Sequence, residues 1–175
     1  MIKDSGERRQ FDTGAVRDMQ KGKGRCDLMP LDVVRRLIAD NARDELILSN
    51  LNTFLQSGDT SFLHQAFTTF CVYSDISSAD SVQACIINNV LQVAIHFEEG
   101  AEKYGEDNWK KGLPAKCYID SAVRHYLKWL RGDTDERHDR AFLWNLMCCI
   151  WTCERMPELN NYLKDEEKGV AKNES

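Results

Sequence analysis

Three glutamates stand close together in residues 96–102, in a Glu-Glu-x-x-Glu pattern. On a helix, Glu98, Glu99 and Glu102 would lie within about one turn, because residues three and four apart are neighbours on the helix surface. Carboxylate oxygens are the ligands that Mg²⁺ prefers, and phosphate oxygens commonly complete its coordination shell. The pattern predicts a catalytic magnesium site, and the alternative is an acidic helix end exposed to solvent.

The helical phase of Glu98 favours the metal site. Glu98 follows Ala94 by four residues and Leu91 by seven, and therefore prolongs the apolar stripe that these residues form with Ile87 and Ile95. A carboxylate that faces the interior of a bundle is costly unless a cation or hydrogen bonds compensate its charge. We therefore expect the stripe to face the core and the glutamates to bind a cation there.

A second polar face begins the last strong helix of the sequence. His138 follows Asp135 by three residues and Asn145 follows His138 by seven, so all three would lie on one face of a helix over residues 133–154. Helix capping explains acidic residues near Asp133, but it does not explain Asn145 in the middle of an apolar face. We expect Asp135, His138 and Asn145 to help hold the cation.

Between these helices lies a loop with the side chains that a nucleotide pocket needs. Its cations suit a triphosphate, its rings suit a base and its amide suits hydrogen bonding; the candidates are Lys103, Tyr104, Asn108, Trp109 and Lys111. Arg124 follows Asp120 by one turn, so it is either a phosphate clamp or one half of a surface ion pair.

Hydrophobic spacing predicts helices that would position these residues. Apolar residues recur at helical intervals in residues 30–58, before Tyr104, in residues 114–132 and in residues 133–154, with a shorter apolar piece at residues 62–73. Ser77 or Ser78 is the expected N-cap of the long helix, and three glycines are expected helix stops: Gly58, Gly105 and Gly132. No segment alternates with period two for long enough to indicate a sheet. The prediction is an all-α bundle of about five or six helices.

The polar ends of the chain divide it into three predicted parts. Residues 1–29 are polar and glycine-rich and should form an arm outside the core, residues 30–163 the helical domain, and residues 164–175 a disordered tail.

Composition narrows the partners and the location. The chain has 175 residues and a net charge of −5, which gives no general attraction for long nucleic acid. Its seven cysteines include no Cys-x-x-Cys pair and read as reduced residues of a cytoplasmic protein. No run approaches the roughly 18 apolar residues of a membrane span, so no membrane partner is expected.

The sequence resembles the MazG-like all-α nucleoside triphosphate pyrophosphohydrolases, and within them the phage dATP/dGTP diphosphohydrolases. The matching motifs are the glutamate cluster with residues 103–109, the glycine-rich residues 22–28, Arg124-His125, His138 and Trp144-Asn145. One departure is that Phe142 and Asn145 stand where the MazG-like pattern has Glu-x-x-Asp. Residues 40–85 match no known motif.

This resemblance implies hydrolysis of dGTP, and of dATP, to the monophosphate and pyrophosphate. Mg²⁺ would be the cofactor, with Mn²⁺ or Co²⁺ as substitutes, and the enzyme would be a homodimer or homotetramer in the cytoplasm of a phage-infected cell. The dGMP product would supply diaminopurine nucleotide synthesis.

For such a reaction we expect a metal-activated water to attack the α-phosphorus. Lys23, Arg25, Lys103 and Lys111 would then contact the phosphates, and Trp109 or Tyr104 would stack on the purine.

Two alternatives remain open at this stage. The adjacent pair His138-Asp139, preceded by His96 and His125, would suit an HD-type triphosphohydrolase that releases intact triphosphate. The second alternative is a helical protein without activity, which would bind a host factor through its acidic helices.

Overall fold

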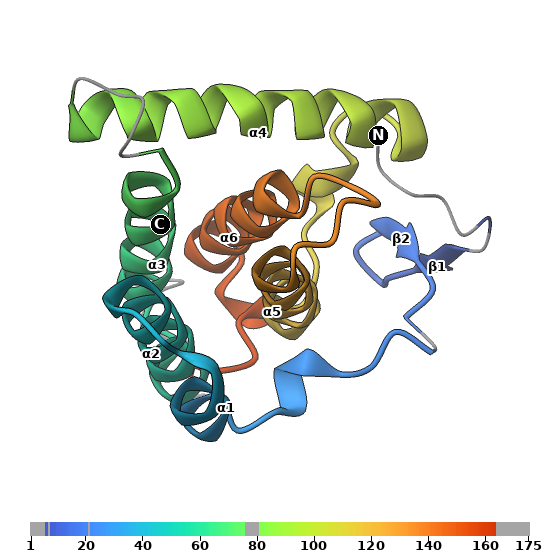
Figure 1. Cartoon of the computed structure of the whole chain (residues 1–175). Helices are drawn as coiled ribbons and strands as arrows, with labels where there is room; N and C mark the ends of the chain where they lie inside the picture. The colour runs from blue at the N-terminus through green and yellow to red at the C-terminus, as the bar shows by residue number, and fades with distance from the viewer. Residues whose placement is uncertain (1–5, 7, 21, 76–80, 164–175) are drawn as a thin grey trace.

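The structure is a computed structural model that describes residues 6, 8–20, 22–75 and 81–163. Its described residues form six α-helices and one short hairpin, which confirms the all-α class (Figure 1). In chain order the elements are β1 (Arg8–Gln10), β2 (Val16–Asp18), the 3-10 turn η1 (Cys26–Leu28), α1 (Leu31–Ile38), α2 (Ala42–Ser57), α3 (Ser61–Asp75), α4 (Val82–Tyr104), η2 (Asn108–Lys111), α5 (Ala115–Arg131), α6 (His138–Arg155) and η3 (Pro157–Leu159).

Helices α5 and α6 form the centre of the molecule. A short connection joins them, and α2 and α3 pack to one side while α4 crosses above α6 (Figure 1). Large side chains from both central helices are fully buried, among them Tyr118, Tyr126 and Phe142. Burying a side chain of this size stabilises the fold by about 2 kcal/mol, so the central pair carries much of the core.

Local signals in the sequence set most helix ends. Gly58 ends α2 with φ 72°, and Gly132 ends α5 with φ 81°, conformations in which a residue without Cβ avoids strain. Gly105 follows α4 as expected. The N-cap of α4 is Ser81, whose side chain accepts from the Ala84 amide, whereas Ser77 and Ser78 lie outside the described residues.

Two segments of the sequence hold more helix than expected. The apolar piece at residues 62–73 is the middle of α3, a helix of 15 residues. Residues 30–58 form two helices instead of one, because Asn41 caps α2 by accepting a hydrogen bond from the Asp44 amide at 3.1 Å.

The N-terminal segment is more than a polar arm. Strands β1 and β2 pair antiparallel, with Arg8 opposite Asp18, and Ala15 in their connection is 1% exposed and belongs to the core. The expectation that residues 1–29 lie outside the core is therefore wrong for Ala15. The strands have three residues each, too few to show a period-two pattern.

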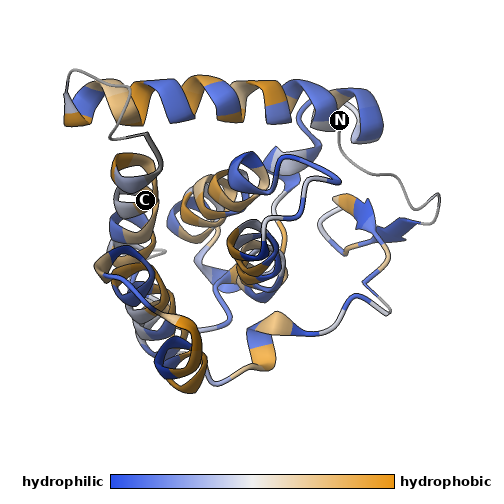
Figure 2. Cartoon of the chain, in the orientation of Figure 1, coloured by the Kyte–Doolittle hydropathy of each residue, from blue (hydrophilic) through white to orange (hydrophobic). Residues whose placement is uncertain are grey.

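The phase expected for α4 is also wrong. Ile87, Leu91 and Ile95 are 50%, 61% and 39% exposed, whereas Val93 and His96 are buried against the rest of the protein. Residues 82–97 contain no Asp, Glu, Lys or Arg, so apolar spacing alone did not distinguish the two faces. Orange segments recur along α4 in Figure 2 up to its C-terminal end, which is blue. Helix α4 thus exposes an apolar stripe, although none of the described helices is long and apolar enough to cross a membrane.

Candidate active site

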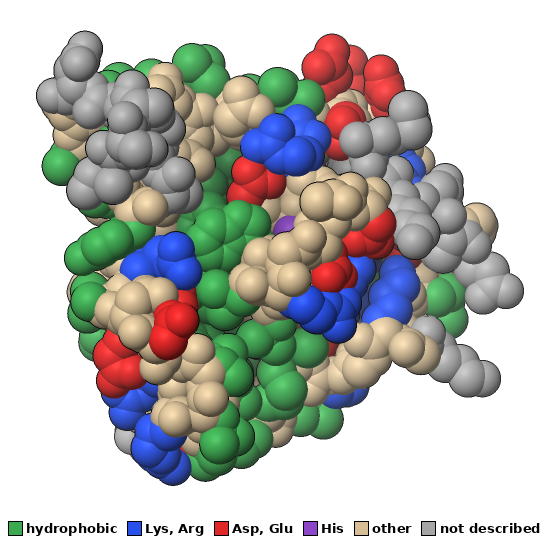
Figure 3. Space-filling model, viewed as in Figure 1, with side chains coloured by type: hydrophobic (Ala, Val, Ile, Leu, Met, Phe, Trp, Pro, Cys, Tyr) green, Lys and Arg blue, Asp and Glu red, His purple; other side chains and the backbone are tan. Residues whose placement is uncertain are grey.

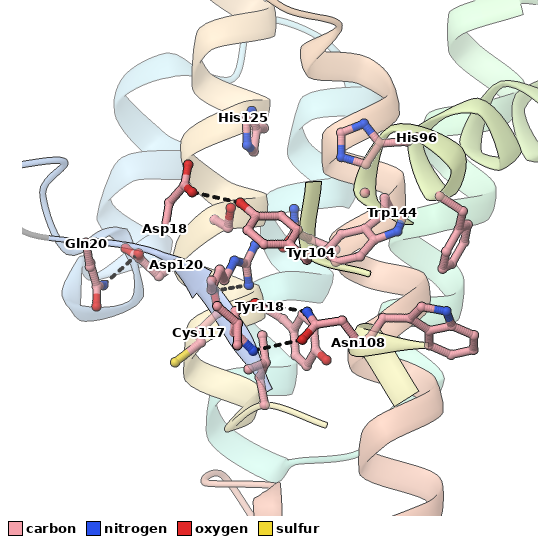
Figure 4. Close-up of a pocket in the computed structure, with 18 of the residues that line it drawn as sticks. Asp18, Gln20, His96, Tyr104, Asn108, Cys117, Tyr118, Asp120, His125 and Trp144 are labelled. Atoms are coloured by element: carbon pink, nitrogen blue, oxygen red, sulfur yellow. Dashed lines mark hydrogen bonds between the residues drawn. The ribbon is translucent and has the colours of Figure 1, made fainter. Parts of the chain in front are cut away.

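A cavity of about 760 Å³ lies among the hairpin, the second half of α4, η2, α5 and the start of α6. This volume is within the range of small-molecule sites. Figure 4 shows side chains from these elements converging on it, with Tyr104, Tyr118 and Trp144 grouped near its centre. The cavity brings the N-terminal hairpin segment, residues 9–23, together with residues 96–145.

Asp18 of β2 organises one side of the cavity. Its carboxylate accepts hydrogen bonds from Lys103 Nζ and Tyr104 Oη, both at 2.9 Å, and from Arg8 Nη1 at 3.2 Å. Burial alone would raise the pKa of Asp18, but these donors hold it below its ordinary value. Burial and the bond to Asp18 raise the pKa of Tyr104. Two of the predicted substrate-binding residues therefore fix Asp18 in this structure.

Arg17 of β2 belongs to the cavity lining. Its Nη2 donates to Asn145 Oδ1 at 2.6 Å, and its guanidinium lies 5.7 Å from the Tyr118 ring centroid and 5.8 Å from that of Trp144. Asn145 in turn donates from Nδ2 to the Ala141 carbonyl at 2.7 Å. Asn145 is thus an anchor for β2 in this structure.

Asp120 and Arg124 hold the glycine-rich segment against α5. Asp120 accepts a hydrogen bond from Gln20 Nε2 at 2.7 Å. It also forms an ion pair with Arg124, which is the second of the two roles predicted for this arginine. Arg124 also donates to the carbonyls of Lys23 and Gly24 at 3.0 and 3.2 Å. This contact of Arg124 was not predictable from local spacing, because the partners lie about 100 residues apart along the chain.

Lys23 lines the cavity with a partly exposed side chain. Its Nζ lies 3.9 Å from Asp18 Oδ2, a distance that leaves room for another partner. Burial lowers the pKa of Lys23, while the carboxylate of Asp18 opposes that shift. By contrast, the predicted phosphate contacts Arg25 and Lys111 lie outside the cavity lining, with Arg25 paired to Asp27 and Lys111 Nζ 3.4 Å from the Gly14 carbonyl.

Two histidines and two carboxylates meet where α5 ends and α6 begins. His125 Nδ1 and His138 Nδ1 are 2.9 Å apart, and His138 Nε2 lies 2.8 Å from Asp135 Oδ1. Glu136 Oε1 lies 3.5 Å from His125 Nδ1 and 3.6 Å from His138 Nδ1. The bond to His138 lowers the pKa of Asp135 to about 2, and burial with the neighbouring His138 places the pKa of His125 well below its ordinary value. Asp135 and His138 are among the predicted metal ligands, whereas Glu136 is not.

The three glutamates of α4 point in different directions. Glu98 lines the cavity but is exposed, and Glu102 is exposed outside the lining. Figure 3 shows acidic side chains gathered on the surface at this end of α4. Glu99 is half-buried, with Oε1 3.6 Å from Arg140 Nη2. Burial alone would raise the pKa of Glu99, but nearby positive charge lowers it.

Aromatic side chains form an apolar wall. Trp109 packs edge-on against Phe97 and Trp151, with ring centroids 5.2 and 5.0 Å away. Trp144 lines the cavity, and its buried Nε1 has no hydrogen-bond partner among the described residues. A buried donor of this kind suits a ligand acceptor, because an unmade hydrogen bond is costly. Asn108 instead joins Val16, donating to its carbonyl and accepting from its amide at 2.9 Å each.

Comparison with known proteins identifies the enzyme class. The sequence model described as dATP/dGTP diphosphohydrolase, N-terminal, matches residues 78–162, which include α4, η2, α5 and α6. The hairpin lies outside the matched region. Neither the curated proteins nor the solved structures gave a match. The match covers most of the cavity wall and agrees with the motifs of the sequence, so residues 78–162 form a dATP/dGTP diphosphohydrolase N-terminal domain, which assigns the protein to the nucleoside triphosphate pyrophosphohydrolases.

Proposed function

We propose that this protein hydrolyses dGTP, and dATP, to the monophosphate and pyrophosphate in the cavity, with Mg²⁺ as cofactor and Mn²⁺ or Co²⁺ as substitutes. The observation that carries the proposal is the charge of the cavity. The cavity lining holds seven carboxylates (Asp18, Glu98, Glu106, Asp107, Asp120, Asp135, Glu136) and five cations (Arg9, Arg17, Lys23, Arg124, Lys128). A triphosphate entering this surplus of negative charge needs divalent cations beside it.

The donor chemistry fits such a cation. Glu98 stands at the cavity, and Glu99 and Glu102 lie within one helix turn of it. We propose that Glu98 holds Mg²⁺ together with the phosphates, and that the side chains of Glu99 and Glu102, which lie outside the cavity lining, turn toward the bound ion and join it. A bound divalent cation would supply charge neutralisation and a water of lowered pKa. Asp135, His138 and Asn145, predicted to assist, have other partners in this structure.

The chain itself would bind and orient the triphosphate. Lys23 has the exposure and the position to contact phosphate oxygens, and Arg124 keeps the segment that carries Lys23 in place. Lys103 acts through Asp18, whose partners include Lys23 as well. The proposal leaves out Arg25 and Lys111 because they lie outside the cavity lining.

The purine would lie against the aromatic wall. Trp109 and Tyr104 offer ring faces, and Trp144 Nε1–H is a buried donor for a ring nitrogen or the exocyclic oxygen of guanine. If this is the base site, Trp144→Phe should raise KM for dGTP while the protein remains folded.

A product assay with each common ribo- and deoxynucleoside triphosphate plus Mg²⁺ tests the proposal. Monophosphate and pyrophosphate from dGTP or dATP are expected, and Glu98→Gln and Glu102→Gln should abolish turnover without lowering Tm. If Glu98→Gln and Glu102→Gln both keep full activity, these glutamates do not take part in catalysis. If no divalent cation supports turnover, the alternative of a helical protein without activity that binds a host factor is favoured.

Intact triphosphate among the products would favour the HD-type alternative. His125 and His138 do meet, as that alternative requires. However, Asp139 pairs with Arg137 at 2.6 Å instead of joining the two histidines, so the adjacent His-Asp pair does not form one site.

The biological setting of the proposal comes from the resemblance. We propose that the enzyme acts in the cytoplasm of a phage-infected cell, where its dGMP supplies diaminopurine nucleotide synthesis. We also propose a homodimer or homotetramer, since the exposed stripe of α4 is uncharged and apolar and a second copy would cover it.

A further inference from the structure

The meeting point of α5 and α6 has the dimensions of a metal centre. His125 Nδ1, His138 Nδ1 and Glu136 Oε1 form a triangle with sides of 2.9, 3.5 and 3.6 Å. A cation equidistant from the three atoms would lie about 2 Å from each, which is the length of zinc–nitrogen and zinc–oxygen bonds. The three atoms therefore need little movement to bind one ion.

Asp135 supplies the support that metal-binding histidines usually have. A carboxylate only accepts, so the 2.8 Å contact with Asp135 Oδ1 places the proton of a neutral His138 ring on Nε2. The Nδ1 lone pair of His138 then faces His125 and Glu136. A ligating histidine typically donates its second ring N–H to a carboxylate, which orients the ring and raises its basicity.

A second possible trio uses the same histidine and is less suitable. Asp133, Asp135 and His138 also lie within 4.8 Å of one another. In that set His138 would have to offer Nε2, whose proton Asp135 already accepts, and Asp133 pairs with Arg131 at 2.7 Å. The trio with His125 and Glu136 avoids both conflicts.

We propose that His125, Glu136 and His138 form a site for a divalent transition cation such as Zn²⁺, Co²⁺ or Mn²⁺. The site is distinct from the Mg²⁺ site proposed on α4, because two imidazoles with one carboxylate suit transition cations, whereas Mg²⁺ prefers oxygen ligands.

The site opens toward the cavity. His125 and Glu136 belong to the cavity lining, while the His138 side chain is 1% exposed. Three protein ligands leave a fourth position of a tetrahedral ion for water or for a phosphate oxygen of a ligand in the cavity.

The test is a titration of the full-length, chelator-treated protein with Co²⁺, followed by its visible absorption and by calorimetry with Zn²⁺. We expect one equivalent to bind with the intense visible bands of four-coordinate Co²⁺, whereas any Co²⁺ held by oxygen ligands at the α4 carboxylates would be six-coordinate and absorb weakly. The seven cysteines could compete, and thiolate binding would add a sulfur-to-cobalt charge-transfer band in the near ultraviolet. That band, or no binding at all, would overturn the site.

Variants assign the ligands. His125→Gln and Glu136→Gln should each lower Co²⁺ affinity at least tenfold, and Asp135→Asn should lower it about 10- to 100-fold through loss of orientation. His96→Gln, which changes another buried cavity histidine, is the control and should keep the four-coordinate bands and the affinity of the parent. Unchanged affinity in both His125→Gln and Glu136→Gln contradicts the site. Turnover of dGTP with Mg²⁺ is measured separately, so failure of the proposed function leaves these results unaffected.

Discussion

Asn108 should hold the hairpin wall of the cavity in place. Its side chain makes two hydrogen bonds to Val16 of β2, donor and acceptor at 2.9 Å each, and thus pairs with that strand as a neighbouring strand would. Each bond is worth about 1 kcal/mol, so Asn108→Ala should weaken the docking of β2 by about 2 kcal/mol. At 1.4 kcal/mol per factor of ten, this predicts about a 30-fold increase in local opening.

Hydrogen exchange measures that opening directly. The Val16 amide should exchange about 30-fold faster in Asn108→Ala, and KM for dGTP should rise because Arg17 and Asp18 lie on the same strand. Asn161→Ala is the matched control, since Asn161 accepts one hydrogen bond from the Lys116 amide and lies outside the cavity lining. Protection of Val16 that is equal in parent and Asn108→Ala protein would refute the anchoring role.

Three further predictions concern other parts of the protein. Burial lowers the pKa of His96 to about 4, so the folded state favours the neutral ring. The free energy of unfolding should therefore be highest above pH 6.5 and fall by about 3 kcal/mol on acidification to pH 4. In urea unfolding, His96→Gln should lose less of this free energy over the same pH range. Tyr126→Phe removes a buried hydrogen bond of 2.6 Å to the Asp44 carboxylate and should lower the free energy of unfolding by about 2 kcal/mol in the same assay. Leu91→Lys should shift the molar mass seen by light scattering toward the monomer, whereas Leu37→Lys on α1, at 77% exposure, should not; equal masses for the two variants would contradict self-association through α4.

The helices were predictable where local chemistry decides their ends. Gly58 and Gly132 adopt positive φ, and such a glycine ends a helix whatever the tertiary structure. The phase of α4 was not predictable in this way. Its residues 82–97 are uncharged, so the buried side depends on packing against α3 and α6, which only the fold determines.

The hairpin was missed for a different reason. Its strands have three residues each, and their anchors Asn108 and Asn145 lie 92 and 128 residues away from the residues they hold. No window of sequence contains both partners of such a contact. Some predicted residues of α4, η2 and α6 do line the cavity, among them Glu98, Asn108 and Asn145, whereas the positions of Arg17 and Asp18 were not predictable.

Asn145 illustrates what a sequence can state about a site. An amide in the middle of an apolar face needs a polar partner, and a cation was a reasonable inference from that need. The partner in the structure is a cation of another kind, the guanidinium of Arg17, with Nη2 2.6 Å from Asn145 Oδ1. A metal ion bound to the same oxygen would lie against this positive charge and be repelled. The amide thus serves to place Arg17 over the neighbouring Tyr118 and Trp144 rings in the cavity lining, where its charge can meet the proposed triphosphate.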